Sequence, residues 1–149
     1  MQELHGLETE IVRNPRYEEG QSTSVAAGVR AIAGRCDGAL FVPCDQPLLS
    51  PATLNLLIDE AGHGQSSEGA AIVRPRYGDR PGAPVLFPAE LFDQLLTLSG
   101  DEGGRQLLRL LPERIRDVPI KNADEGFDID TEAGLDQLGR RQGIAAPKE

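Results

Sequence analysis

The chain has 149 residues, of which 39% are hydrophobic and 26% are charged, a balance typical of one globular domain. Its formal charge of −9 argues against nonspecific nucleic-acid binding, which depends on lysines and arginines that neutralise phosphates. No apolar run approaches the ~20 residues needed to cross a membrane, and the N-terminus lacks the pattern of a secretory signal. We therefore expect a cytoplasmic protein without a membrane partner.

The first half of the chain predicts strands that alternate with helices. Residues 8–12 are compatible with a short strand, and apolar residues spaced by three and four predict a helix from Ser22 to Gly34. Residues 38–43 form a short apolar run, which indicates a strand buried on both faces. Pro51 is suited to the first position of another helix. The glycine-rich residues 62–69, with His63, are predicted to form a loop.

The second half continues the same alternation. Its predicted elements, in order, are a strand at 70–74, a loop at 74–82, a strand at 83–87, a helix from Pro88, a helix at 105–111, an edge strand at 115–120, a polar loop at 124–131 and a helix at 132–142. This order predicts an α/β fold, with a layered sheet and helices on its faces, in a single domain over residues 1–149.

Two acidic positions are candidates for metal ligands. Ligands in open α/β sheets sit beyond the carboxyl ends of the strands, and Asp45 follows the strand at 38–43. Asp128 and Asp130 are two apart, which puts both on the same side of an extended segment. Carboxylates suit Mg²⁺. The alternatives are structural: Asp45 as the start of a turn before Pro47, and Asp130 or Thr131 as a helix cap.

A glycine-rich segment, Gly100-Asp-Glu-Gly-Gly-Arg105, leads into a predicted helix. Backbone amides at a helix start can bind an anion, and Arg105 could assist. The segment is neither a Walker loop nor a dinucleotide fingerprint. An ordinary turn between two helices explains it equally well.

Five segments in order resemble the MobA-like nucleotidyltransferases, and most closely their molybdenum-cofactor cytidylyltransferase branch. They span nearly the whole chain. They are Asn14-Pro15 with Glu19-Gly20-Gln21-Ser22-Thr23-Ser24, Pro43-Cys-Asp-Gln-Pro47, Gly82-Ala-Pro-Val-Leu-Phe87, Gly100-Asp-Glu-Gly-Gly-Arg105 and Asp128-Ile-Asp-Thr131.

The resemblance implies a three-layer, Rossmann-like nucleotidyltransferase sheet and a role for each matched position. Asp45, Asp130 and Asp128 are implied to bind Mg²⁺, with Asp45 and Asp130 taking the catalytic role. The implied nucleotide-binding positions are Asn14, Gly20, Ser24, Pro43 and Asp45, and the implied acceptor-binding positions are Gly82, Asp101 and Arg105.

The chain departs from the family pattern at two places. The family's opening strand and its glycine-rich loop, of the type Leu-Ala-Ala-Gly-x-Ser-x-Arg-Met-Gly, have no counterpart in this sequence, which predicts an N-terminally truncated domain. Ala83 stands where many relatives carry histidine. An exposed sheet edge left by the missing strand could pair with a second copy, which admits a homodimer.

The implied reaction is the transfer of CMP from CTP to the phosphate of molybdopterin. GTP, or another phosphorylated small molecule as acceptor, remains an alternative within the enzyme class. The missing loop also suggests an alternative outside the enzyme class, in which the chain is an inactive fragment or an interaction module.

Overall fold

The computed structural model of the protein describes residues 6–63, 65–66, 69–129, 131, 134 and 138. The chain divides into two compact units, each built from two separate stretches of sequence. The first unit comprises residues 1–39 and 88–113, and the second comprises residues 40–87 and 114–149. The predicted helix at 132–142 falls largely outside the described residues.

The helices lie close to where the apolar spacing predicts them, because each presents an apolar stripe to its own unit. Short 3-10 helices accompany them at Tyr17–Glu19 (η2), Ala89–Leu91 (η3), Pro112–Arg114 (η4) and Ala123–Gly126 (η5). The α-helices are α1 (Gln21–Ile32), α2 (Pro51–His63), α3 (Phe92–Thr97) and α4 (Arg105–Leu110).

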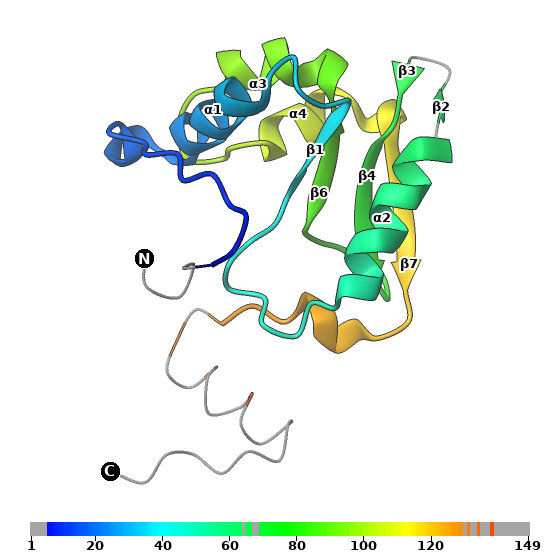
Figure 1. The fold of residues 1–149 in the computed structure, drawn as a ribbon. Coiled ribbons are helices and arrows are strands. Elements are labelled where there is room, and N and C mark those ends of the chain that lie inside the picture. Colours follow the sequence, from blue (N-terminus) through cyan, green and yellow to red (C-terminus); the bar gives the residue numbers. More distant parts are fainter. Residues whose placement is uncertain are drawn as a thin grey trace, which may run out of the picture. The chain divides into compact units, whose positions relative to one another are not determined.

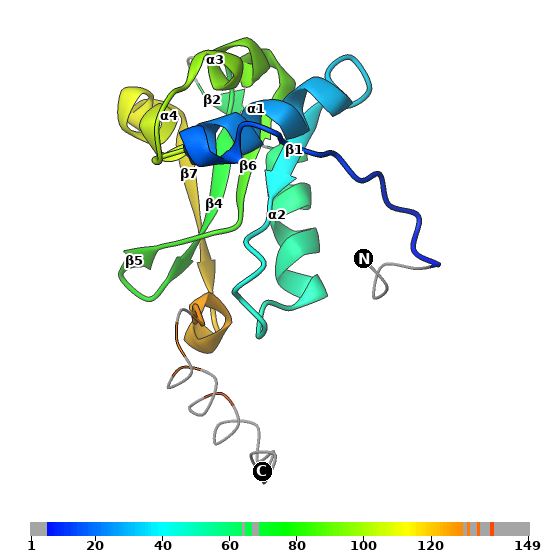
Figure 2. The ribbon, with the colours of Figure 1, turned by 90° about the vertical axis from the view of Figure 1, so that its left-hand side faces the viewer.

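The first unit is organised around α1, which packs against α3 (Figure 2). Val29 of α1 and Leu95 of α3 are fully buried. The first unit also ties its two stretches of sequence together through the backbone, since Ala89 N donates to Asp37 O at 2.8 Å. These contacts fix the position of α1 within its own unit.

The second unit contains most of a five-stranded mixed sheet (Figure 1). β4 pairs in parallel with β7, from Ile72 opposite Ile115 to Tyr77 opposite Ile120. It pairs antiparallel with β5 and with β6. The strands are β1 (Gly38–Phe41), β2 (Gln65–Ser66), β3 (Gly69–Ala70), β4 (Ile72–Tyr77), β5 (Arg80–Pro81), β6 (Val85–Pro88) and β7 (Ile115–Ile120), of which β2 and β3 form a separate hairpin.

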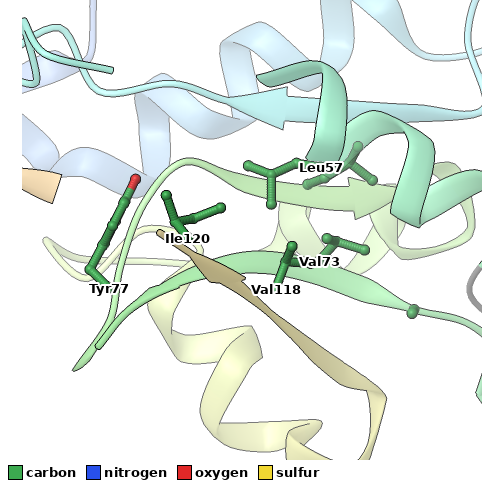
Figure 3. Close-up of a cluster of buried hydrophobic side chains, with 7 residues drawn as sticks. Leu57, Val73, Tyr77, Val118 and Ile120 are labelled. Atoms are coloured by element: carbon green, nitrogen blue, oxygen red, sulfur yellow. The ribbon is translucent and has the colours of Figure 1, made fainter. Parts of the chain in front are cut away.

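The core of the second unit lies between α2 and the strands β4 and β7 (Figure 3). Leu57 of α2 and Val73 of β4 are fully buried, and Val118 of β7 is nearly so. Burial of such a side chain contributes about 1.5–3 kcal/mol of hydrophobic stabilisation. This core sets the positions of the segments that leave β1 and β7.

Three local predictions are wrong. Residues 8–12 form no strand, and exposed Ile11 and Val12 bury no apolar face there. Residues 74–82 are not a loop throughout, because β4 continues to Tyr77 and turns back into β5. His63 ends α2 rather than lying in a loop.

The predicted α/β class is confirmed, and its sheet is mixed, with both parallel and antiparallel pairs. Across the part of the chain that the structure describes, none of the helices has the length and apolar character that a membrane span requires.

Candidate functional site

Asn14 connects the turn before α1 to the first turn of that helix. Its Nδ2 donates to Thr23 Oγ1 at 2.8 Å and to Ser24 Oγ at 2.9 Å. Its Oδ1 accepts from the backbone N–H of Arg16 at 3.0 Å. The structure therefore brings together two of the predicted nucleotide-binding positions, Asn14 and Ser24.

Gly20 lies immediately before α1 and is packed against the loop that contains Gly100. Its φ of +112° belongs to a region that L side chains rarely adopt, and a Cβ there would lie 2.6 Å from the carbonyl carbon and oxygen of Gly100. Ser22, which is fully buried, donates to the same Gly100 oxygen from its Oγ at 2.5 Å and from its N–H at 3.1 Å. Glycine is thus required at position 20 by both backbone conformation and space.

Asp101, a predicted acceptor-binding residue, lies beside Gly20 at the start of α1. Its Oδ1 would be 2.9 Å from a Cβ on Gly20. A carboxylate near a helix N-terminus interacts favourably with the partial positive charge there. We call this group of residues (Asn14, Gly20, Ser22, Gly100 and Asp101) the helix-start cluster.

Arg105 begins α4 and is exposed. Its neighbour Glu102 forms an ion pair with Arg109. The hydrogen bond from Arg109, helped by the charges of Arg109 and Arg105, lowers the pKa of Glu102 against the opposing effect of burial. Gly82, the third predicted acceptor-binding residue, belongs to the second unit, whereas Asp101 and Arg105 belong to the first. The predicted acceptor-binding set is therefore divided between the two units.

In the second unit, the loop after β1 lies beside the segment that follows η5. Ile129 N donates to Asp45 O at 2.9 Å, and Gln46 Nε2 donates to Asp128 Oδ1 at 2.8 Å. Residue 45 therefore contacts residue 129, and residue 46 contacts residue 128. The second pair is 82 residues apart in the sequence. We call these four residues the acidic-loop cluster. Pro43 is half-buried in the same loop, and Asp130 lies outside the described residues.

The acidic-loop cluster contains two buried oxygens that lack a hydrogen-bond partner among the described residues. They are Asp45 Oδ1 and Gln46 Oε1. Leaving one such group unsatisfied costs about 1–3 kcal/mol. A carboxylate and an amide oxygen beside a second carboxylate, Asp128, form a donor set that suits a hard divalent cation. The described part of the chain contains no group of three or more acidic, histidine or cysteine side chains that could hold one.

Glu125 connects the segment before Asp128 to the start of α2 through a hydrogen bond. Its side chain is buried, and its Oε2 accepts from Ser50 N at 3.0 Å. Burial by itself would raise the pKa of Glu125, but hydrogen bonds from Thr53 and Ser50 outweigh it and lower the pKa. Ser50 Oγ caps α2 by accepting from Thr53 N at 3.2 Å, and the Glu125 carboxylate supports that cap from a distant part of the sequence by accepting the N–H of Ser50.

Tyr77 is packed between Gly82 and Gly126. A Cβ on Gly82 would lie 2.8 Å from the Tyr77 ring, and a Cβ on Gly126 would overlap that ring. The Tyr77 hydroxyl donates to Ala83 O at 3.0 Å. Burial, reinforced by the negative charges of Glu125 and Asp128, raises the pKa of Tyr77 to about 12. In this structure Gly82 is a packing position against Tyr77.

Three residues in or beside these clusters were not anticipated as functional or supporting residues: Gln46, Tyr77 and Glu125. Gln46 lies inside the Pro43–Pro47 motif, so its place between two prolines and next to Asp45 is a signal that could have found it. Glu125 and Tyr77 carry no such signal, because their partners are distant in sequence.

Comparisons with solved structures define the class of protein. A nucleotidyl transferase from Methanothermobacter matches with a TM-score of 0.73 and 23% identity, over 94% of this chain and 66% of that one. The complex of Mycobacterium tuberculosis Rv0371c with manganese matches with a TM-score of 0.64 and 26% identity, over 77% of this chain and 59% of that one. The fold is that of the nucleotidyltransferases.

Sequence comparisons identify the family. Residues 1–118 match the MobA-like NTP transferase domain. Purine catabolism protein PucB of Bacillus subtilis is 34% identical over 125 residues, which are 83% of this chain and 58% of PucB. Nicotine blue oxidoreductase of Paenarthrobacter nicotinovorans is 32% identical over 124 residues, which are 81% of this chain and 60% of that protein. The chain belongs to the MobA-like NTP transferase family and spans about 60% of the length of these relatives.

Proposed function

We propose that this chain supplies cation-binding, nucleotide-binding and acceptor-binding residues of a Mg²⁺-dependent cytidylyltransferase. The reaction transfers CMP from CTP to the phosphate of molybdopterin. A phosphate oxygen of the acceptor forms a bond to the α-phosphorus of CTP, and the bond from that phosphorus to the bridging oxygen of pyrophosphate breaks. Membership of the MobA-like NTP transferase family supports nucleotidyl transfer, and the cytidine base and pterin acceptor are the finer parts of the proposal.

The observation that carries the proposal is the acidic-loop cluster. Asp45 Oδ1 is buried without a hydrogen-bond partner among the described residues, in the loop after β1 and next to Gln46, which donates to Asp128. Asp45 and Asp128 would hold the cation, and we include Asp130 as a third ligand from its place in the sequence. When bound, a divalent cation offsets the charge on phosphate oxygens. A manganese complex of a 26% identical neighbour is in keeping with a divalent ion.

The helix-start cluster would serve the nucleotide in this proposal. Asn14 and Gly20 shape the turn before α1, and Ser24 lies in its first turn. Their contribution is positional, since catalysis by nucleotidyl transfer depends chiefly on placing the reacting groups and neutralising charge. Asp101, Arg105 and Gly82 are kept in the proposal as acceptor-binding positions on the strength of the family resemblance alone.

The test is the dependence of nucleotide binding on Mg²⁺ and on Asp45. Isothermal calorimetry would measure CTP and GTP affinity with and without Mg²⁺, for the unaltered chain, for Asp45→Ala and for the exposed control Asp59→Ala. We expect Asp45→Ala to weaken Mg²⁺-dependent binding by at least about tenfold, as for the loss of a metal-site group. Unchanged affinity in Asp45→Ala would reject the cation site, and preference for GTP would replace cytidylyl with guanylyl transfer.

The acceptor is tested separately. Incubating a phosphorylated pterin with each labelled nucleotide and Mg²⁺ should release pyrophosphate and yield a pterin dinucleotide, detected by mass spectrometry. Binding of Mg²⁺-CTP without any such product would retain the nucleotide assignment and reject the pterin.

A further inference from the structure

Gln46, between Asp45 and Pro47, has a side-chain amide in which only one of the two polar atoms has a hydrogen-bond partner among the described residues. Gln46 is 8% exposed, so its amide group is inside the second unit rather than in solvent. The Nε2 group donates to Asp128 Oδ1 at 2.8 Å, while Oε1 is buried and lacks a partner within the described ranges. Buried amide oxygens are normally hydrogen-bonded, so this one requires an explanation.

The orientation of the amide is fixed by its partner. A carboxylate accepts hydrogen bonds and cannot donate them, so the amide nitrogen must face Asp128. A flipped amide would place Oε1 against a carboxylate oxygen, and the two would repel. The unsatisfied atom is therefore the oxygen, and a cation or a hydrogen-bond donor is what would satisfy it.

The backbone around Gln46 also restricts where the side chain can reach. Pro47 disfavours helical geometry at Gln46. Gln46 O accepts from Leu49 N at 3.3 Å, which closes a turn after Asp45. Asp128, by contrast, is exposed, and a free carboxylate at the surface would sample several orientations. The hydrogen bond from the buried glutamine restrains one oxygen of this exposed group.

We propose that Gln46 is a positioning residue of the cation site, which holds Asp128 toward the ion and directs its own Oε1 at the same ion beside Asp45. This inference rests on the proposed function, because it assumes that Asp45 binds a divalent cation. In this proposal the two unpartnered oxygens, Asp45 Oδ1 and Gln46 Oε1, bind the same cation. Amide oxygens are accepted ligands of hard cations, and residues that orient a ligand strongly affect metal affinity.

The experiment uses Mn²⁺ alone as the probe and needs no nucleotide. Electron paramagnetic resonance would measure free Mn²⁺ in titrations of the full chain, and thermal denaturation would be recorded in metal-free buffer. Gln46→Met keeps the length of the side chain and removes both polar atoms. Gln94→Met, on the exposed face of α3, is the matched control. Gln46→Asn keeps the chemistry and shortens the reach, and it stands in if the Met variant fails to fold.

We expect Gln46→Met to weaken Mn²⁺ binding by about tenfold or more, with an unchanged or higher metal-free melting temperature, because an unsatisfied buried oxygen has been removed. Gln46→Asn should weaken binding in the same direction, and Gln94→Met should leave it unchanged. Asp128→Asn should also weaken binding, and the double variant should lose less than the product of the two single effects, since Gln46 acts through Asp128.

The outcomes separate this inference from the proposed function. If Asp45→Asn abolishes Mn²⁺ binding while Gln46→Met and Gln46→Asn bind normally, Gln46 has no part in the site and the cation assignment stands. A Gln46→Met protein that melts earlier without metal yet keeps its Mn²⁺ affinity would make Gln46 a purely structural residue. Unchanged binding in Asp45→Asn would remove the cation site itself.

Discussion

The helix-start cluster and the acidic-loop cluster differ in how completely their polar groups are satisfied. In the first, Asn14 donates to the first turn of α1 and Ser22 donates to Gly100 O, and close packing requires glycine at position 20. In the second, two buried oxygens, on Asp45 and Gln46, are unpartnered within the described residues. The first cluster is complete without a ligand, whereas the second has the composition of a site that a ligand completes.

The largest effect is expected at Gly20, where a substitution tests the close packing of the helix-start cluster. Gly20→Ala should lower the free energy of unfolding by about 3 kcal/mol or more, because it combines an unfavourable φ with overlap against Gly100. Urea denaturation would measure the loss. Gly28→Ala is the control: its Cβ would meet nothing within 4 Å, and alanine in a helix should stabilise by about 0.5–1 kcal/mol. Similar small changes in both variants would contradict the described packing.

A smaller effect is expected where the acidic-loop cluster is anchored to α2. Glu125→Gln should destabilise the protein by about 1–2 kcal/mol at neutral pH, through the weakened cap at Ser50. Because folding lowers the pKa of Glu125, its stabilisation is present above the unfolded value, ~4.3, and is lost as pH falls through the folded pKa. Denaturation from pH 7 to pH 3 would show the two proteins converging. The exposed control Glu113→Gln should track the unaltered chain, and a constant gap at all pH values would argue against the cap.

Tyr77→Phe should cost about 1 kcal/mol at neutral pH, through the lost hydrogen bond to Ala83. Folding raises the pKa of Tyr77 to about 12. The stabilisation from the neutral phenol is therefore full below the unfolded value, ~10, and declines as pH rises from there toward the folded value. Stability measured between pH 7 and pH 11 should fall more steeply for the unaltered chain than for Tyr77→Phe. Tyr17→Phe, at a residue 66% exposed, should show no such difference.

The smallest effect is expected at the exposed member of the acidic-loop cluster. Asp128→Asn in metal-free buffer should change the free energy of unfolding by no more than about 0.5 kcal/mol, as is usual for surface substitutions. Chemical denaturation beside Asp59→Asn would measure it. A substantially larger loss would mean that Asp128 serves the fold itself, and the contrast between the two clusters would disappear.

The sequence predicted the parts of the fold that depend on local pattern. The apolar run at 38–43 contains β1, and the apolar spacing after Ser22 matches α1 within a residue or two. The extent of β4 could not be read from the sequence, because Pro75 and two arginines interrupt the apolar pattern, while pairing with β7 keeps the strand extended. The extent of β4 is therefore set by its tertiary contacts with β7.

For the candidate site, too, the sequence predicted only what depends on local pattern. The rule that ligands bind beyond strand ends singled out Asp45, and spacing singled out Asp128. The link through Gln46 could not be deduced, since a hydrogen bond across 82 residues leaves no trace in local spacing. Gly82 was expected at the acceptor, but the structure reveals its contact with Tyr77. The roles of all these residues in binding remain predictions.

The contact between Gln46 and Asp128 joins segments near opposite ends of the second unit's sequence. The chain must have folded the intervening strands before these two side chains can meet, so the unfolded chain offers no preformed site. Any ion held there is therefore thermodynamically linked to folding. At a hundredfold excess over its dissociation constant it would add about 2.7 kcal/mol to the unfolding free energy, and chelation would make the same protein easier to melt and to digest.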